Sequence, residues 1–236
     1  MNDTMINIES AMELLPGFQY LYKGDTDELD ASIIGHIIKQ GWAMESSSET
    51  RINAVFQAGM DKNDIYCTSS SSLSTIKGAI GKCRFIASGM DELKLINEVA
   101  SDYLAHGHLE SVGLSVVADD YDDEKLKGFR MKDLPELSKE ARRLPFISIR
   151  GCFILGNVNR LTGESLGRYI QNCYGTAKQI STLIPCKISY VNLAGCLQPV
   201  LRTIGEGQEA SKELKTLSDI VSSLNKTPFN AGLLIQ

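Results

Sequence analysis

The segment FQYLYKGD, residues 18–25, joins a short run of aromatic and aliphatic residues to a lysine, a glycine and an aspartate. Aromatic and apolar side chains of this kind favour a β-strand, and glycine and aspartate are typical of the turn that ends one. A lysine at the end of a strand is usually a solvated side chain. The alternative is that Lys23 projects into an enclosed site. The rest of the sequence helps to decide between these two interpretations.

Short apolar runs of the same kind recur along the chain, separated by segments whose apolar residues repeat at helix spacing. This alternation is typical of repeated βα units. At two helix starts the sequence resembles a capping box: Ser46 with Glu49 has the S-x-x-E spacing, and Ser88 with Asp91 and Glu92 resembles it in looser form. Strands are predicted over residues 18–23, 42–45, 64–67, 84–87, 111–118, 146–153, 187–193 and 229–235, and helices over about 6–15, 26–39, 48–58, 72–80, 90–105, 132–143, 163–182 and 206–224.

Eight parallel strands with helical crossovers form either a closed barrel or an open doubly wound sheet. The chain has 236 residues and 43% hydrophobic content, which is enough for one large core. Eight βα units in a chain of this length favour closure, because α/β barrels commonly occupy about 200–250 residues. We therefore predict a single-domain α/β fold over residues 1–236, a (β/α)8 barrel of the TIM type with a short N-terminal helix. The open sheet is the alternative.

The distribution of charge argues against nucleic acid as a partner, because 24 Lys and Arg are scattered among 29 Asp and Glu. No apolar run approaches the ~18–20 residues that span a bilayer, and the start MNDTMINIES lacks the features of a signal peptide. The six cysteines include no CxxC pair, so we expect reduced, mostly buried thiols and no metal site. A cytoplasmic protein that binds neither nucleic acid nor membrane is expected.

The active site of such barrels lies at the C-terminal ends of the strands. There, Lys23 and its strand resemble the Y-A-x-K-x-N segment of the fold-type III pyridoxal-phosphate enzymes, which include the ornithine and diaminopimelate decarboxylases and the alanine racemases. In that family the lysine forms a Schiff base with the cofactor. Further segments similar to the family's follow in the same order, namely GWAMESSSET (41–50), RFIASGMDEL (84–93), SVGLSVVADDYDDEKLKGF (111–129), FISIRGCFILGNVN (146–159) and KISYVNLAGCL (187–197).

The resemblance implies an alanine racemase-like barrel that binds pyridoxal 5′-phosphate, with Lys23 as the catalytic Schiff-base lysine. The serine run from Ser69 to Ser72 offers further hydrogen bonds to the phosphate, although such a run is more often a helix-capping turn. The implied cofactor-binding residues are Lys23, Ser46, Phe153, Gly156, Asn157, Gly195 and Gly232.

Three segments depart from the family's pattern. Phe153 stands where the family has a histidine facing the cofactor ring, and the glycine-rich phosphate loop is reduced to Ala194-Gly195-Cys196. The E-P-G-R segment, whose carboxylate keeps the pyridine nitrogen protonated, is replaced by Asn230-Ala231-Gly232-Leu233. The family's β-domain, which supplies a cysteine across a dimer interface, has no counterpart in these residues.

The segments that match the family pattern and those that depart from it leave two functions open. The first is a pyridoxal-phosphate-dependent amino-acid decarboxylase or racemase acting on an amino acid or a related amine. The second is a catalytically degenerate homologue, a pseudoenzyme that serves as a binding or regulatory partner in a homodimer or with another chain. An unrelated barrel enzyme that uses the acidic tract 119–124 is a further alternative.

Overall fold

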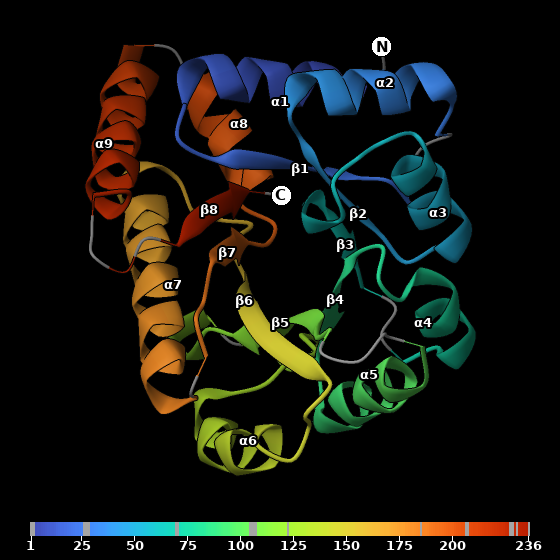
Figure 1. Ribbon diagram of the computed structural model, residues 1–236. Coiled ribbons are helices and arrows are strands. Elements are labelled where there is room, and N and C mark those ends of the chain that lie inside the picture. Colours follow the sequence, from blue (N-terminus) through green and yellow to red (C-terminus); the bar gives the residue numbers. More distant parts are fainter. Residues whose placement is uncertain are drawn as a thin grey trace.

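The computed structural model describes residues 3–25, 29–68, 71–103, 108–121, 123–184, 186–205, 208–226, 229 and 231–235. Its strands form a closed barrel in which each strand is parallel to the next and β8 pairs with β1 (Figure 1). The predicted barrel is therefore confirmed and the open sheet is excluded. The strands are β1 (Gln19–Lys23), β2 (Ala43–Ser46), β3 (Ile65–Cys67), β4 (Arg84–Ala87), β5 (Glu110–Val117), β6 (Ile147–Leu155), β7 (Tyr190–Leu193) and β8 (Gly232–Ile235).

Helices surround the barrel, and their inner faces bury the main apolar core against the outer faces of the strands (Figure 1). No helix within the described ranges is long and apolar enough to cross a membrane. The helices are α1 (Asp3–Leu14), α2 (Ala31–Gln40), α3 (Glu49–Gln57), α4 (Leu73–Ala79), α5 (Met90–Tyr103), α6 (Leu134–Ala141), α7 (Gly163–Leu183), α8 (Leu197–Gly205) and α9 (Gln208–Leu224), with short 3-10 turns η1 (Lys62–Asp64), η2 (Asp119–Tyr121) and η3 (Met131–Asp133).

Helix α8 was not predicted from the sequence. It begins at Leu197, directly after the turn that ends β7, and contains Pro199 in its first turn. Proline is tolerated there because the first amide groups of a helix have no partner within the helix. The structure therefore places an additional helix start beside the C-terminal end of β7.

The two predicted capping boxes have different outcomes. The Glu92 carboxylate accepts hydrogen bonds from the backbone N–H of Ser88 at 2.6 Å and from its Oγ at 3.0 Å, as expected for a carboxylate at a helix start. The prediction for Ser46 was wrong, because α3 begins at Glu49 and its N-cap is Ser48. Ser46 Oγ instead accepts from the Ser48 N–H at 3.0 Å.

A second, smaller apolar cluster fills the inside of the barrel. Tyr190 occupies its centre, and close approach to its ring requires glycine on the neighbouring strands: a Cβ on Gly151 would lie 2.1 Å from Tyr190 Cζ. The rings of Tyr66 and Tyr190 have centroids 5.3 Å apart, and those of Tyr66 and Phe153 are 5.4 Å apart. This group, here called the aromatic cluster, comprises Leu21, Ala43, Tyr66, Ile86, Phe153, Tyr190 and Leu234.

Candidate functional site

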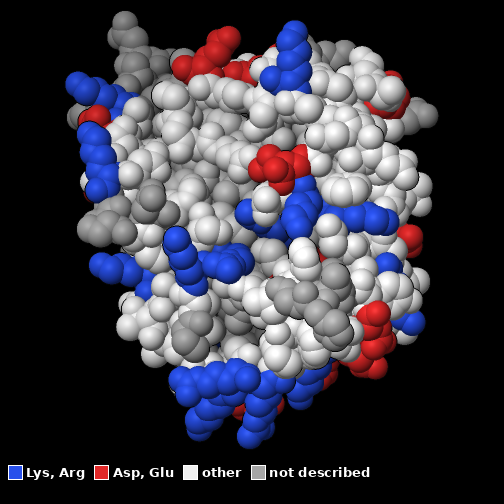
Figure 2. All heavy atoms as spheres, viewed as in Figure 1, with Lys and Arg blue, Asp and Glu red and all other residues white. Residues whose placement is uncertain are grey.

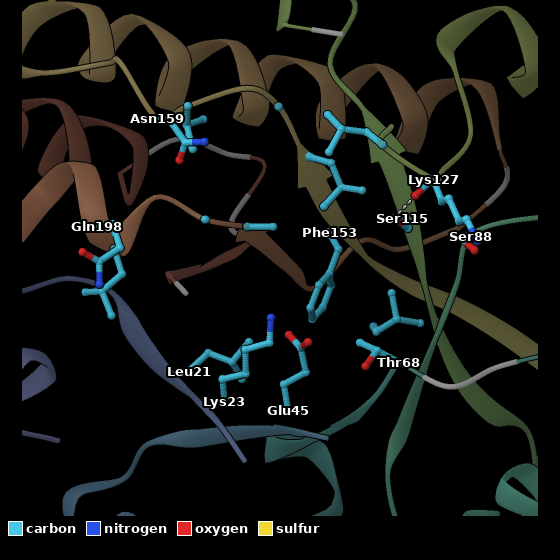
Figure 3. Close-up of a pocket in the computed structure, with 18 of the residues that line it drawn as sticks. Leu21, Lys23, Glu45, Thr68, Ser88, Ser115, Lys127, Phe153, Asn159 and Gln198 are labelled. Atoms are coloured by element: carbon cyan, nitrogen blue, oxygen red, sulfur yellow. Dashed lines mark hydrogen bonds between the residues drawn. The ribbon is translucent and has the colours of Figure 1, made fainter. Parts of the chain in front are cut away.

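A cavity of about 770 Å³ opens at the C-terminal ends of the strands, above the aromatic cluster (Figure 3). This is the end at which barrels of this type build their sites. On the side formed by β1–β5, here called the polar half, the strand ends present an ammonium, a carboxylate and hydroxyl groups. These groups belong to Lys23, Glu45, Thr68, Ser88 and Ser115.

Lys23 and Glu45 lie side by side in the polar half. Lys23 is the last residue of β1 and is paired in register with Glu45 on β2, so both side chains lie on the inner face of the barrel. Figure 3 shows the ammonium of Lys23 directed toward the Glu45 carboxylate. Glu45 is only 7% exposed, whereas Lys23 is exposed. The barrel thus holds a primary amine at the cavity with an acidic side chain beside it.

Hydrogen bonds organise the part of the polar half nearest β4 and β5. Glu92 lines the cavity and is fixed by its two bonds from Ser88. Ser115 Oγ donates to the carbonyl oxygen of Lys127 at 3.2 Å, which ties the segment after β5 to the strand (Figure 3). Lys127 is also among the described residues that line the cavity and, after Lys23, is the second cationic one.

The other side of the cavity, formed by β6–β8 and here called the apolar half, presents an aromatic ring and small residues. Phe153 on β6 is 3% exposed. Gly195 lies in the four-residue turn closed by the Cys196 N–H on the Leu193 carbonyl at 3.2 Å, and its φ of 78° requires glycine. The apolar half comprises Phe153, Leu155, Gly156, Ala194 and Gly195.

Backbone donors are available where the turn at Gly195 leads into α8. Leu197 and Gln198, the first residues of that helix, line the cavity. The N–H groups of a helix's first turn lack intrahelical partners and carry partial positive charge, so they favour an anion such as a phosphate. The apolar half therefore offers backbone groups for an anion where the polar half offers side chains.

Asn192 is a buried polar side chain inside the barrel. It is 0% exposed, and neither atom of its amide has a hydrogen-bond partner within the described residues. Its register partners are Phe153 on β6 and Leu234 on β8, and it lies on the same face of β7 as the cavity residue Ala194. Burying an amide without hydrogen-bond partners destabilises the folded protein. Because Asn192 lies beside Phe153, which borders the cavity, its amide is a candidate hydrogen-bonding group for a ligand.

The structure brings four of the seven predicted cofactor residues together. Lys23, Phe153, Gly156 and Gly195 line the one cavity. The serine run is divided: Ser71 lines the cavity and Ser72 caps α4 by accepting from the Thr75 N–H at 3.3 Å. Ser69, Ser70 and Asn230 lie outside the described residues.

The remaining three predicted residues are not among those that line the cavity. Ser46 is fully buried, and its Oγ donates to Asp25 Oδ1 at 2.5 Å. Asn157 is exposed and its backbone N–H donates to the Tyr121 carbonyl at 3.0 Å, while Asn159 lines the cavity instead. Gly232 is the first residue of β8 and so lies at the opposite end of the barrel.

The residues of the cavity fit pyridoxal phosphate as a bound group, although not all of its family partners are present. A primary amine, a ring-sized apolar wall and a helix N-terminus behind a positive-φ glycine form a suitable donor set, contributed by Lys23, Phe153, Gly195 and the start of α8. An acid for the pyridine nitrogen is not found on the described part of β8, whose residues are Gly232, Leu233, Leu234 and Ile235.

The chain resembles known proteins in structure but not detectably in sequence. No family model matches the chain and no curated protein matches its sequence. Among solved structures, the arginine decarboxylase of Paramecium bursaria Chlorella virus is 14% identical, with a TM-score of 0.69 over 99% of this chain and 60% of that one. The ornithine decarboxylase of Entamoeba histolytica is 13% identical, with a TM-score of 0.71 over 99% and 62%.

A diaminopimelate decarboxylase from Helicobacter pylori, solved with L-lysine, gives a similar result, with 13% identity and a TM-score of 0.68 over 99% of this chain and 60% of that one. The chain thus spans about 60% of the length of these proteins. At such identities the likeness establishes the fold. The chain has the fold of the barrel portion of these amino-acid decarboxylases, as the resemblance of its segments predicted.

Proposed function

We propose that this barrel binds pyridoxal 5′-phosphate covalently through Lys23 and acts on an amino acid by decarboxylation or racemisation. The observation that supports the proposal most directly is the position of the Lys23 amine, at the end of β1 and in the wall of a cavity of about 770 Å³. When bound, the cofactor supplies an electron sink for charge that develops at the substrate Cα.

The chain's own residues divide the work of holding the cofactor. The turn at Gly195 and the first turn of α8 receive the phosphate, because their backbone N–H groups face an anion without steric hindrance from a Cβ. Phe153 provides an apolar surface for the ring. Glu45, which points toward Lys23 in Figure 3, accepts or returns the proton of the Lys23 amine.

Lys127 supports an amino acid as the substrate. It and Lys23 are the cationic side chains among the described residues that line the cavity. With Lys23 committed to the cofactor, Lys127 remains to attract the substrate carboxylate. The bond from Ser115 Oγ to the backbone carbonyl of Lys127 ties this segment to β5, so the exposed side chain of Lys127 extends from the cavity wall.

Cofactor attachment is tested by absorbance and by chemical trapping. Incubation with pyridoxal phosphate is expected to give a band near the edge of the visible range, and borohydride reduction should leave a phosphopyridoxyl group on the peptide that contains Lys23. Lys23→Ala should abolish both signals. Lys127→Ala removes the other lysine of the same cavity and serves as the matched control, which should keep them. A label on Lys127, or no label at saturating cofactor, would refute the assignment.

A non-catalytic binding role is a second candidate, favoured by the apolar side chains of β8 where the family has a carboxylate. Without that group the cofactor ring withdraws electrons less strongly, and turnover can fall by orders of magnitude. Release of carbon dioxide and loss of optical activity, measured on a panel of L-amino acids with cofactor-loaded protein, separate the two. Stoichiometric labelling of Lys23 without turnover would establish a cofactor-binding protein rather than an enzyme.

A further inference from the structure

A second hollow, of about 310 Å³, lies at the end of the barrel opposite to the cavity. It is bordered by the C-terminal end of α6, the start of β6 and the segment between α7 and β7. Its side chains include three cations and one hydroxyl group. The described lining residues are Ala141, Arg142, Ile147, Ser148, Ile149, Arg150, Ile184, Cys186 and Lys187.

An irregularity in β6 directs one of the cations toward this hollow. Val112 on β5 pairs with Ile149 and the next residue, Gly113, pairs with Gly151, so Arg150 is an extra residue in its strand. Such a bulge re-aims a side chain. Ser189 fixes the bulge, because its N–H and its Oγ both donate to the Arg150 carbonyl, at 2.7 and 3.0 Å.

The other two cations come from different elements. Arg142 is the C-cap of α6, and Lys187 lies three residues before β7 begins. A cation at a helix C-terminus offsets the helix dipole, which accounts for Arg142 alone. Arg150 and Lys187 are not at a helix end, so the dipole does not explain why they border the same hollow.

The hollow has no negative charge of its own within the described residues that line it. The adjacent Arg143 shows the ordinary arrangement, because it forms an ion pair with Glu140 at 2.7 Å. Figure 2 shows Lys and Arg side chains gathered at the edge of the molecule over α6. Three cations around one concavity repel each other, and a bound anion removes that repulsion.

We propose that this hollow binds a small molecule that bears a phosphate group. Arginine presents a planar fork of donors that matches phosphate oxygens, and two arginines with a lysine suit a dianion. The volume of about 310 Å³ exceeds that of a bare phosphate and falls at the lower end of the range for small-molecule pockets. The site is at the opposite end of the barrel from Lys23 and is independent of the function proposed for that lysine.

Cys186 offers a way to detect occupancy of the hollow. It is half-buried, whereas the other five cysteines are buried. Burial raises the pKa of its thiol to about 11, while the charge of Arg150 acts in the opposite direction. An anion bound between them would both shield the thiol and offset the effect of Arg150, so alkylation of Cys186 should become slower.

The experiment uses the full chain, with inorganic pyrophosphate as the probe at low ionic strength. Calorimetry measures its affinity, and peptide mapping after timed iodoacetamide treatment measures the alkylation rate of Cys186. Arg150→Gln and Lys187→Gln should each weaken binding about 10- to 100-fold, as expected for loss of a charged hydrogen-bond donor. Arg143→Gln removes the same charge from a neighbouring, ion-paired position and should change the affinity less than about twofold.

Thermal unfolding of each variant checks that it folds, and the exposed Lys187 provides a test if Arg150→Gln does not. Equal weakening in all three variants would mean a diffuse electrostatic field and overturn the site. So would binding no stronger than that of chloride at equal ionic strength, or an unchanged alkylation rate at saturation. Binding of an acidic peptide without binding of pyrophosphate would replace the small molecule with a protein partner and also overturn the proposal.

Discussion

The polar half and the apolar half of the barrel mouth differ in how far they keep the chemistry that the family resemblance implies. The polar half has the lysine that the resemblance implies, at the end of β1, with Glu45 paired beside it on β2. The departures at Phe153 and at Ala194-Gly195-Cys196 fall in the apolar half, whereas Gly232 and Leu233 of the third departure begin β8 at the opposite end of the barrel. The amine that the resemblance implies as the cofactor lysine therefore lies in the polar half, and two of the three departures from the family pattern lie in the apolar half.

The apolar half rests on the aromatic cluster, and Gly151→Ala should disturb it most. A Cβ at this position would lie 2.1 Å from Cζ of Tyr190, which is a buried residue. We expect a loss of about 3 kcal/mol in the free energy of unfolding, measured by urea denaturation.

Gly35→Ala provides the control for this substitution. Gly35 lies in α2, and a Cβ at this position would have nothing within 4 Å, so alanine should stabilise the protein by about 0.5–1 kcal/mol. Tyr190→Leu should rescue part of the Gly151→Ala defect. A neutral effect of Gly151→Ala would show that the aromatic cluster does not determine the packing beneath the apolar half.

Strand β5, the last strand of the polar half, buries Glu110 at its start, where burial raises the pKa of the carboxyl group to about 7. The folded protein then keeps this proton to higher pH than the unfolded chain does. The contribution of Glu110 to stability should be fully present below pH about 4.5 and should be lost as pH rises through about 7, an effect on the order of 2 kcal/mol.

Glu110→Gln tests the origin of this pH dependence. The amide can still accept the hydrogen bond that the Gly81 N–H donates to Glu110 at 2.9 Å, but it cannot ionise. Unfolding free energies between pH 5 and 8 should therefore vary less in the variant than in the wild type. A pH profile unchanged by the substitution would assign the effect to other groups.

Asn192 lies in the apolar half, and Asn192→Leu should increase stability by about 1–2 kcal/mol. The substitution replaces a fully buried amide, which has no hydrogen-bond partner in the described residues, with an apolar side chain of similar size. If the amide serves a ligand, the same variant should bind pyridoxal phosphate more weakly. Loss of stability in the unliganded variant would contradict this interpretation of Asn192.

Gly195→Ala should produce the smallest change, about 1 kcal/mol of lost stability, because φ is 78° while the nearest atom to a Cβ is Val158 Cγ2 at 3.4 Å. Gly41→Ala is the matched control, since Gly41 also has positive φ, at 67°, and ends α2 away from the cavity. Both variants should lose similar stability, but only Gly195→Ala should weaken cofactor binding several-fold. Equal cofactor affinity would exclude the Gly195 turn as the phosphate site.

The fold was largely predictable, because each strand–helix unit has its own apolar periodicity and eight such units in 236 residues favour closure. The site was less predictable. All four residues of β2 are buried, so alternation of apolar and polar residues does not indicate which of Glu45 and Ser46 faces inward. Gly232 was assigned from the family's E-P-G-R segment, but it is the first residue of β8 and so lies at the end of the barrel opposite to the cavity.

The ring layer of Tyr66, Phe153 and Tyr190 has a kinetic consequence for any reaction at Lys23. It fills the barrel directly beneath the cavity, and the Arg84 guanidinium lies 4.7 Å from the Tyr190 ring centroid on the far side. As far as the described residues show, substrate and product therefore pass through the same mouth of the cavity. A slowly departing product would block the next arrival, and inhibition by it should be competitive with the starting compound.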